Sequence, residues 1–151
     1  MCADRSKLQN TAFEDGALPT QLGLLTNLVY LEFNGTLATG AIPTQLGALT
    51  ALQHLTLKEA YLTGTVPSQL GLLTALTELN LVGDGGDDGV SGTMPTTLGA
   101  LTQLTGLDLQ LLQLSGPIPS ELGALTDMQH LCAPPPLPAD STRFAYNDLA
   151  R

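Results

Sequence analysis

Apolar and polar positions follow one pattern that recurs along most of the chain. Each unit has an apolar residue before a proline, then xxLGxLT, then LxxLxxLxL, and a glycine just before the next apolar–Pro pair. The prolines, spaced by 24, 24, 28 and 24 residues, are Pro19, Pro43, Pro67, Pro95 and Pro119. Self-similarity at such a period is the signature of a stacked repeat array. The pattern therefore predicts a single array of small repeated units, with no boundary between separate globular domains.

Within one unit, the pattern predicts a short strand, a turn and a short helical turn. Leu55 and Leu57 alternate, which places both side chains on one face of a strand. A glycine and a proline follow; the glycine allows a tight turn and the proline prevents a long helix. Leu70, Leu73 and Leu76 are three residues apart, as suits a short helical turn. Since one coil cannot bury its own leucines, identical coils are expected to stack with their strands side by side.

The repeated segment resembles a known repeat family. LTQLTGLDLQLLQLSGPIPSELGALT, residues 101–126, is similar to the plant-type leucine-rich repeat LxxLxxLxLxxNxLSGxIPxxLGxLxx. The resemblance implies an α/β repeat solenoid, a right-handed superhelix with a concave parallel β-sheet and short helical or 3-10 turns on the convex side. The family includes receptor-like-kinase ectodomains and polygalacturonase-inhibiting proteins. It therefore implies a receptor-like or inhibitor-like module that binds proteins or peptides, without catalysis or a cofactor.

The resemblance also divides the chain. We expect an N-terminal cap or partial repeat over 1–15, an array of four full coils and a partial fifth over 16–133, and a Pro-rich C-terminal cap or tail over 134–151. Leu8 and Phe13 of the N-terminal segment are out of phase with the repeat. The positions of the family's coil-bridging asparagine hold Thr36, Ala60, Asp84 and Leu112. Because Ala and Leu side chains cannot hydrogen bond, turn backbone groups need other partners, which predicts reduced stability.

The outward positions of the predicted strands form three columns on the concave face. They hold Tyr30, His54, Glu78, Gly106 and His130 in the first, Glu32, Thr56, Asn80, Asp108 and Cys132 in the second, and Asn34, Lys58, Val82 and Gln110 in the third. Solenoids of this kind commonly bind ligands on the concave surface. The predicted ligand-binding strip is Tyr30, Glu32, His54, Thr56, Lys58, Glu78, Asn80, Asp108, Gln110 and His130. The alternative is ordinary solvated strand surface.

Charge restricts the partners. The net charge is −9, which argues against a nucleic acid or an anionic membrane surface, because both would repel the chain. Within residues 17–131, nine acidic residues stand against Lys58 as the single base. This excess favours a protein or peptide partner with basic residues. The alternative is that the charge keeps a Leu-rich array in solution.

Two candidate chemical sites arise in the sequence. His130 and Cys132 are two residues apart on one predicted strand, with Asp108 beside Cys132 on the neighbouring strand. Such a group could be a thiol nucleophile or part of a metal site, but no oxyanion donor or fourth ligand accompanies it. A thiol-dependent enzyme at Cys132 is therefore only a distant alternative, and we predict no metal. The insert at residues 84–89 lacks the calcium-loop pattern and is interpreted as a loop at a coil edge.

The sequence leaves the compartment open. Cys2 and Cys132 are separated by four or five coils, roughly 20 Å, which is too far for a disulfide. The N-terminal residues lack the apolar stretch of a signal peptide, and no run of apolar residues is long enough to span a bilayer. The family resemblance favours an extracellular place, whereas these features fit an intracellular one equally. A structural section of a longer repeat protein, with no ligand of its own, is the alternative to a binding module.

Overall fold

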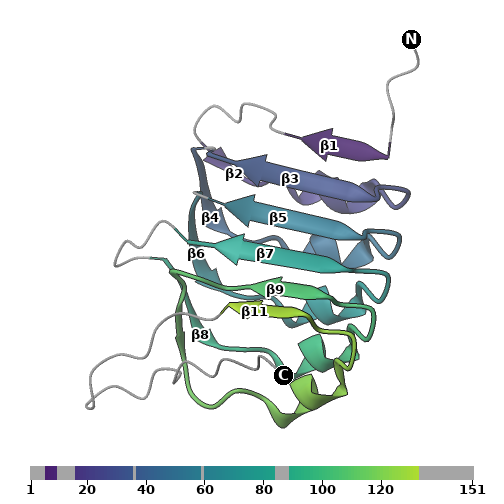
Figure 1. The fold of residues 1–151 in the computed structure, drawn as a ribbon. Coiled ribbons are helices and arrows are strands. Elements are labelled where there is room, and N and C mark those ends of the chain that lie inside the picture. Colours follow the sequence, from purple (N-terminus) through teal and green to yellow (C-terminus); the bar gives the residue numbers. More distant parts are fainter. Residues whose placement is uncertain (1–5, 10–15, 36, 59, 84–88, 133–151) are drawn as a thin grey trace.

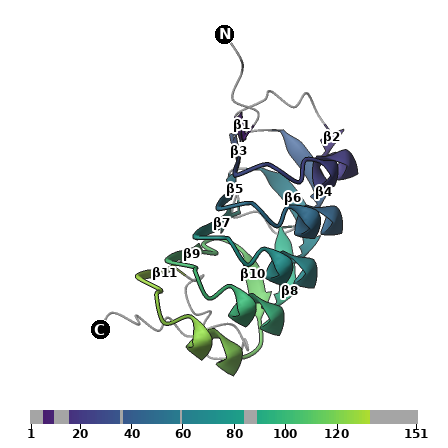
Figure 2. The ribbon, with the colours of Figure 1, turned by 90° about the vertical axis from the view of Figure 1, so that its right-hand side faces the viewer.

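The computed structural model describes residues 6–9, 16–35, 37–58, 60–83 and 89–132. These residues form two parallel sheets and a row of short 3-10 helices, stacked coil upon coil (Figure 1). The stack curves so that the larger sheet lies on its inner side and the 3-10 helices lie on its outer side (Figure 2). The predicted solenoid, with a concave parallel sheet and short turns on the convex side, is confirmed.

The larger sheet has the strand order β1-β3-β5-β7-β9-β11, and all its pairs are parallel. Its strands are β1 (Lys7–Gln9), β3 (Tyr30–Asn34), β5 (His54–Lys58), β7 (Glu78–Val82), β9 (Gly106–Asp108) and β11 (His130–Cys132). Alternate residues point into the core, where Leu55 is 0% exposed and Leu79 is 1% exposed. The predicted inward leucines are confirmed, and they fix which side chains remain on the concave face.

A second, five-stranded parallel sheet was not predicted from the sequence. Its strands are β2 (Gly16–Ala17), β4 (Ala38–Ala41), β6 (Tyr61–Thr65), β8 (Val90–Thr93) and β10 (Gln113–Ser115). Each of its three middle strands contains a glycine with positive φ, as in Gly64 at +81°. The chain then turns at a proline into a 3-10 helix: η1 (Thr20–Leu24), η2 (Thr44–Ala48), η3 (Ser68–Leu72), η4 (Thr96–Ala100) or η5 (Ser120–Ala124).

The glycine of each LG pair allows neighbouring coils to approach closely. A Cβ atom on Gly71 in η3 would lie 2.4 Å from the carbonyl oxygen of Thr97 in the next coil. No side chain fits at that distance. The glycine backbone of one 3-10 helix therefore packs directly against the backbone of the next coil. At Gly123 in η5, the last described coil, a Cβ atom would meet no other atom within 4 Å. The requirement for glycine therefore comes from the following coil.

The N-terminal segment joins the larger sheet. Leu8 pairs with Leu31 across β1 and β3 and packs, partly buried, against the core. The expectation that Leu8 is out of phase is wrong, because strand pairing requires the correct register and not an unbroken repeat length. Phe13 and residues 134–151 lie outside the described residues.

Two of the positions at which the family repeat has its coil-bridging asparagine are part of the core in this chain. Ala60 is 5% exposed and Leu112 is 4% exposed, so both replace a polar side chain with buried apolar surface. Backbone groups link adjacent coils nearby: the Gly35 N–H donates to the Lys58 carbonyl at 3.1 Å. Thr36 and Asp84 lie outside the described residues. The buried methyl groups and these backbone bonds offset part of the expected loss of stability.

Candidate functional site: the concave face

The outward side chains of the larger sheet form the predicted first and second columns. In the first column, His54 lies between Tyr30 and Glu78, and Gly106 lies between Glu78 and His130. The second column runs, strand by strand, through Glu32, Thr56, Asn80, Asp108 and Cys132. The third column runs from Asn34 through Lys58 to Val82.

Gln110 is an exception to the predicted third column. Strand β9 ends at Asp108, and Gln110 lies in the turn that follows, with its side chain exposed. The Asp108 carboxylate accepts a hydrogen bond from the Gln110 N–H at 3.1 Å, and Leu111 has a left-handed φ of 59°. When a side chain accepts a hydrogen bond from the backbone N–H of the second residue after it, the chain favours a turn over a continued strand. Gln110 therefore lies at the edge of the concave face.

At the N-terminal side of the concave face, Glu32 is already surrounded by donors. The Tyr30 hydroxyl donates to its carboxylate at 2.6 Å, and Gln9 donates at 3.3 Å. Asn34 donates to the other carboxylate oxygen. The Tyr30 ring also packs against His54, with 5.3 Å between ring centroids. Sequence reasoning found these residues but not the contacts between them.

The hydrogen bond to Glu32 changes the ionisation of Tyr30. It raises the pKa of Tyr30 above the ordinary value of 10.0, because it stabilises the protonated hydroxyl. Burial of the ring and the negative charge of Glu32 raise the pKa further.

Next along the column, His54 Nδ1 lies 3.2 Å from Glu78 Oε2. Contacts among side chains thus link the first three strands of the repeat array.

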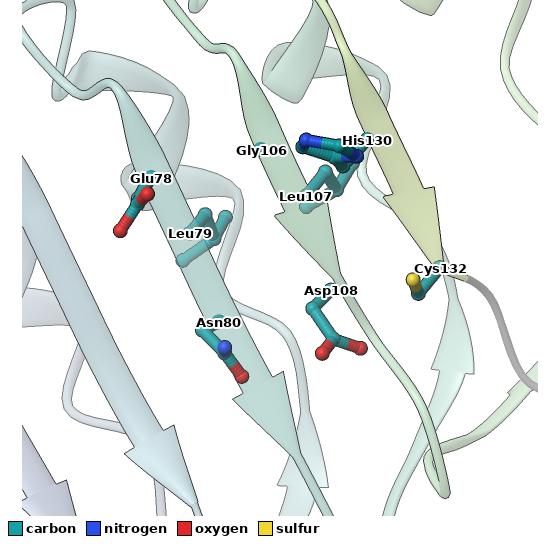
Figure 3. A pocket seen from close by; sticks show the side chains of 8 residues that line it. All are labelled: Glu78, Leu79, Asn80, Gly106, Leu107, Asp108, His130 and Cys132. Atoms are coloured by element: carbon teal, nitrogen blue, oxygen red, sulfur yellow. The ribbon is translucent and has the colours of Figure 1, made fainter.

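The C-terminal side of the concave face is hollowed instead. A hollow of about 210 Å³ is lined by Glu78, Leu79, Asn80, Gly106, Leu107, Asp108, His130 and Cys132. Figure 3 shows Glu78 and His130 on either side of Gly106, which contributes no side chain between them. The Asn80 Oδ1 atom is buried and has no hydrogen-bond partner. We name this space the Gly106 hollow. Sequence reasoning placed Gly106 in the column without recognising the space that it leaves.

The Gly106 hollow also contains the residues of the suggested thiol site. Cys132 is a free, half-buried thiol, and it pairs with Asp108 across β11 and β9. Among the described residues, no side-chain hydrogen bond joins the Cys132 thiol to His130 or Asp108, whereas a thiol nucleophile needs a base within hydrogen-bond reach. Over the same residues, no group of three or more His, Cys, Asp or Glu side chains is placed to hold a metal ion. Cys2 lies outside the described residues.

A second hollow lies on the other side of the coils. It has a volume of about 600 Å³ and is lined by residues between Ala41 and Pro95, none of them charged. Its walls come from β4, β6 and β8 and from the starts of η2 and η3. Without a charged group it offers less to fix the orientation of a ligand than the Gly106 hollow does.

The repeat geometry and the concave face define a leucine-rich repeat solenoid, and the solved structures similar to it include plant receptor ectodomains. The Arabidopsis receptor kinase HAESA, solved with the peptide hormone IDA and the co-receptor SERK1, has a TM-score of 0.75 and 33% identity over 82% of this chain and 20% of that one. The ectodomain of GASSHO1/SCHENGEN3 from Arabidopsis thaliana, solved with CASPARIAN STRIP INTEGRITY FACTOR 2, has a TM-score of 0.78 and 31% identity over 85% of this chain and 15% of that one.

A smaller relative matches over most of its own length. A chain of the BIR3–SERK2 complex from Arabidopsis thaliana is 32% identical, with a TM-score of 0.66, over 85% of this chain and 69% of that one. No family model and no curated protein sequence matches the chain. On the structural relatives, the chain belongs to the plant-type leucine-rich repeat family. It spans about a fifth or less of HAESA and GASSHO1. None of its described helices is both long and apolar enough to cross a membrane.

Proposed function

We propose that this chain is a non-enzymatic binding module that recognises an extended peptide or protein segment on its concave face. The observation that carries the proposal is the register of the larger sheet, which gathers polar side chains from successive repeats onto one surface. The proposed strip is Tyr30, Glu32, His54, Thr56, Lys58, Glu78, Asn80, Asp108 and His130, with Gln110 at its edge. An extended partner can contact several adjacent strands of such a surface at once.

The structural relatives support a receptor-like role over an inhibitor-like one. HAESA was solved with a peptide hormone and a co-receptor, which are both proteinaceous partners. Because this chain spans 20% of HAESA and 15% of GASSHO1, the proposal concerns the part of such a surface that these coils provide. We further propose the division into a cap or partial repeat at 1–15, the array at 16–133 and a C-terminal cap or tail at 134–151.

Charge on the concave face favours a basic partner. Glu78 and Asp108 lie on β7 and β9, and none of the outward side chains of β7, β9 and β11 is a lysine or arginine. The two lysines of the described chain, Lys7 and Lys58, lie on β1 and β5. A partner with basic groups would be attracted to this side, and added salt would weaken the attraction.

The test is selection of a displayed library of linear peptides against the protein, followed by titration of the enriched peptides. We expect Tyr30→Ala and Glu78→Lys to weaken binding, and Gln69→Ala, on the convex helix η3, to leave it unchanged. Loss of binding confined to the convex variant would overturn the concave site. If the loss of affinity in Glu78→Lys does not depend on ionic strength, the proposed attraction of a basic partner by Glu78 would be contradicted.

A second candidate function is structural: the coils would serve as a section of a longer array. Leu25 is 45% exposed, whereas its counterparts Leu49, Leu73 and Leu101 are each 0% exposed. The first coil therefore presents apolar surface where another coil would fit. Sedimentation velocity distinguishes this candidate. It predicts concentration-dependent association that Leu25→Lys abolishes, and a monomer at all concentrations would contradict it.

A further inference from the structure

The Gly106 hollow lies where the first column lacks one side chain. The other strands of the repeat array place Tyr30, His54, Glu78 or His130 at this position of the first column. On β9 the same position is a glycine, so the space between the neighbours on β7 and β11 is unfilled (Figure 3). The gap is bounded below by the backbone over buried Leu79 and Leu107. A single side chain from a partner can therefore enter it.

The polar atoms around the Gly106 hollow are mainly acceptors. Asp108 uses one carboxylate oxygen with the Gln110 N–H, which leaves its second oxygen for a partner, whereas the Glu78 carboxylate is turned away from Gly106 toward His54 (Figure 3). The buried Asn80 Oδ1 is a further acceptor without a donor. No lysine or arginine lines the hollow. A buried acceptor without a partner is costly, so a ligand donor gains free energy if the Asn80 side chain turns to meet it.

We propose that the Gly106 hollow binds the side chain of an arginine in an extended peptide; this inference rests on the proposed function. A guanidinium is planar, always charged and carries five N–H donors, so it can bond to more than one of these acceptors at once. An ammonium has three donors around one point, which makes lysine a weaker match for acceptors spread over two strands. His130 at the far wall offers a ring face on which a guanidinium can stack.

The ligand side of the test uses the peptide library selected on the wild-type protein. We expect the enriched peptides to share an arginine. A synthetic copy of the most enriched peptide, with that arginine replaced by neutral citrulline, should bind roughly ten- to a hundredfold more weakly by calorimetry, because the charge-assisted hydrogen bonds are lost. A lysine copy should fall between the two.

The protein side of the test fills the hollow. A Cβ atom on Gly106 would lie 3.6 Å from Glu78 Cγ, an ordinary contact, and β3 already carries a tyrosine at this position. Gly106→Tyr should therefore fold and should weaken the arginine peptide at least about tenfold. The matched control is Gln21→Tyr, on the exposed surface of η1, with unchanged binding. Asp108→Asn should weaken the same peptide, and Glu121→Gln on η5 should not.

The outcomes separate the inference from the proposed function. Enrichment of arginine peptides that lose affinity with citrulline and with Gly106→Tyr supports both. Peptides that bind the concave face but tolerate citrulline or Gly106→Tyr would overturn the inference and leave the proposed function standing. A library that yields no concave-face binder would overturn the proposed function, and the inference with it.

Discussion

The two sides of the concave face differ in how far their polar groups already have partners. From β1 to β5, Glu32 is bonded by Tyr30 and Gln9, and the Tyr30 ring packs on His54. From β7 to β11, a glycine leaves a hollow, and Asn80 Oδ1 has no donor. A ligand that approaches the first side must replace existing bonds, whereas on the second side it can fill the hollow and supply a donor that Asn80 Oδ1 lacks. The same fold thus places a surface whose polar groups bond to one another next to a surface with an open hollow.

Both sides of the concave face lie on one shared core. Leu55 beneath the first side is 0% exposed and Leu107 beneath the second is 1% exposed. Leu55→Asp and Leu107→Asp should each lower the free energy of unfolding by at least about 3 kcal/mol, since each buries a carboxylate without a partner. Urea denaturation measures the loss, with outward-facing Thr56→Asp as a nearly neutral control. A variant of either leucine that matches the parent would show that its strand register is wrong.

The spacing of the coils gives the next largest effect. In Gly71→Ala, the new methyl group would meet the Thr97 carbonyl oxygen at 2.4 Å, so the coils must shift. We expect a loss of about 1–3 kcal/mol, typical of overpacking. Gly123→Ala, where nothing lies within 4 Å, is the matched control and should be neutral or slightly stabilising. Equal effects in thermal unfolding would contradict the packing of the 3-10 helices.

A spectroscopic prediction tests the hydrogen-bonded side of the concave face, from β1 to β5, alone. Glu32→Gln should lower the pKa of Tyr30 toward its ordinary value of 10.0, because the hydrogen bond to Glu32 is the main cause of the rise. The raised pKa means that this contribution to stability is present below pH 10.0 and is lost as the pH rises through the pKa of the folded protein. Ultraviolet titration of tyrosine ionisation follows the shift. Asp108→Asn, on the other side, should leave Tyr30 unchanged; a shift there would link the two sides.

The smallest effect concerns the boundary between the two sides. Glu78 is 60% exposed at its side chain, and its contact with His54 spans 3.2 Å. Glu78→Gln should therefore change the free energy of unfolding by less than about 0.5 kcal/mol, since an exposed pair gains little against solvent. Chemical denaturation checks this value. A much larger loss would mean that Glu78 supports the fold, and its role in binding could not then be separated from stability.

The features predicted from the sequence are those that depend on the repeat alone. Alternating leucines at a fixed spacing determine the register, so the spacing alone places Tyr30, His54 and Glu78 side by side. The second sheet was missed because its short strands, such as Ala38–Ala41, carry small and polar residues without an alternating apolar face. Gln110 was misplaced because the Asp108 side chain bonds to its backbone and ends the strand.

The Gly106 hollow shows a different limit. Its signal is present in the sequence as one glycine in a column of large side chains, but a missing side chain creates a hollow only if both neighbours leave the space empty. Glu78 turns toward His54, with 3.2 Å between Oε2 and Nδ1, and the sequence alone does not reveal this orientation. The close approach at Gly71 likewise depends on the backbone of the next coil. Both are properties of contacts between repeats.

We propose that recognition centres on β7, β9 and β11 of the concave face. The most direct measurement is an NMR titration of the isotope-labelled protein with the most enriched library peptide, followed at the backbone amides. We expect the largest chemical-shift changes within residues 78–80, 106–108 and 130–132. Largest changes on the convex helices η3 and η4, or changes confined to β1 and β3, would contradict it.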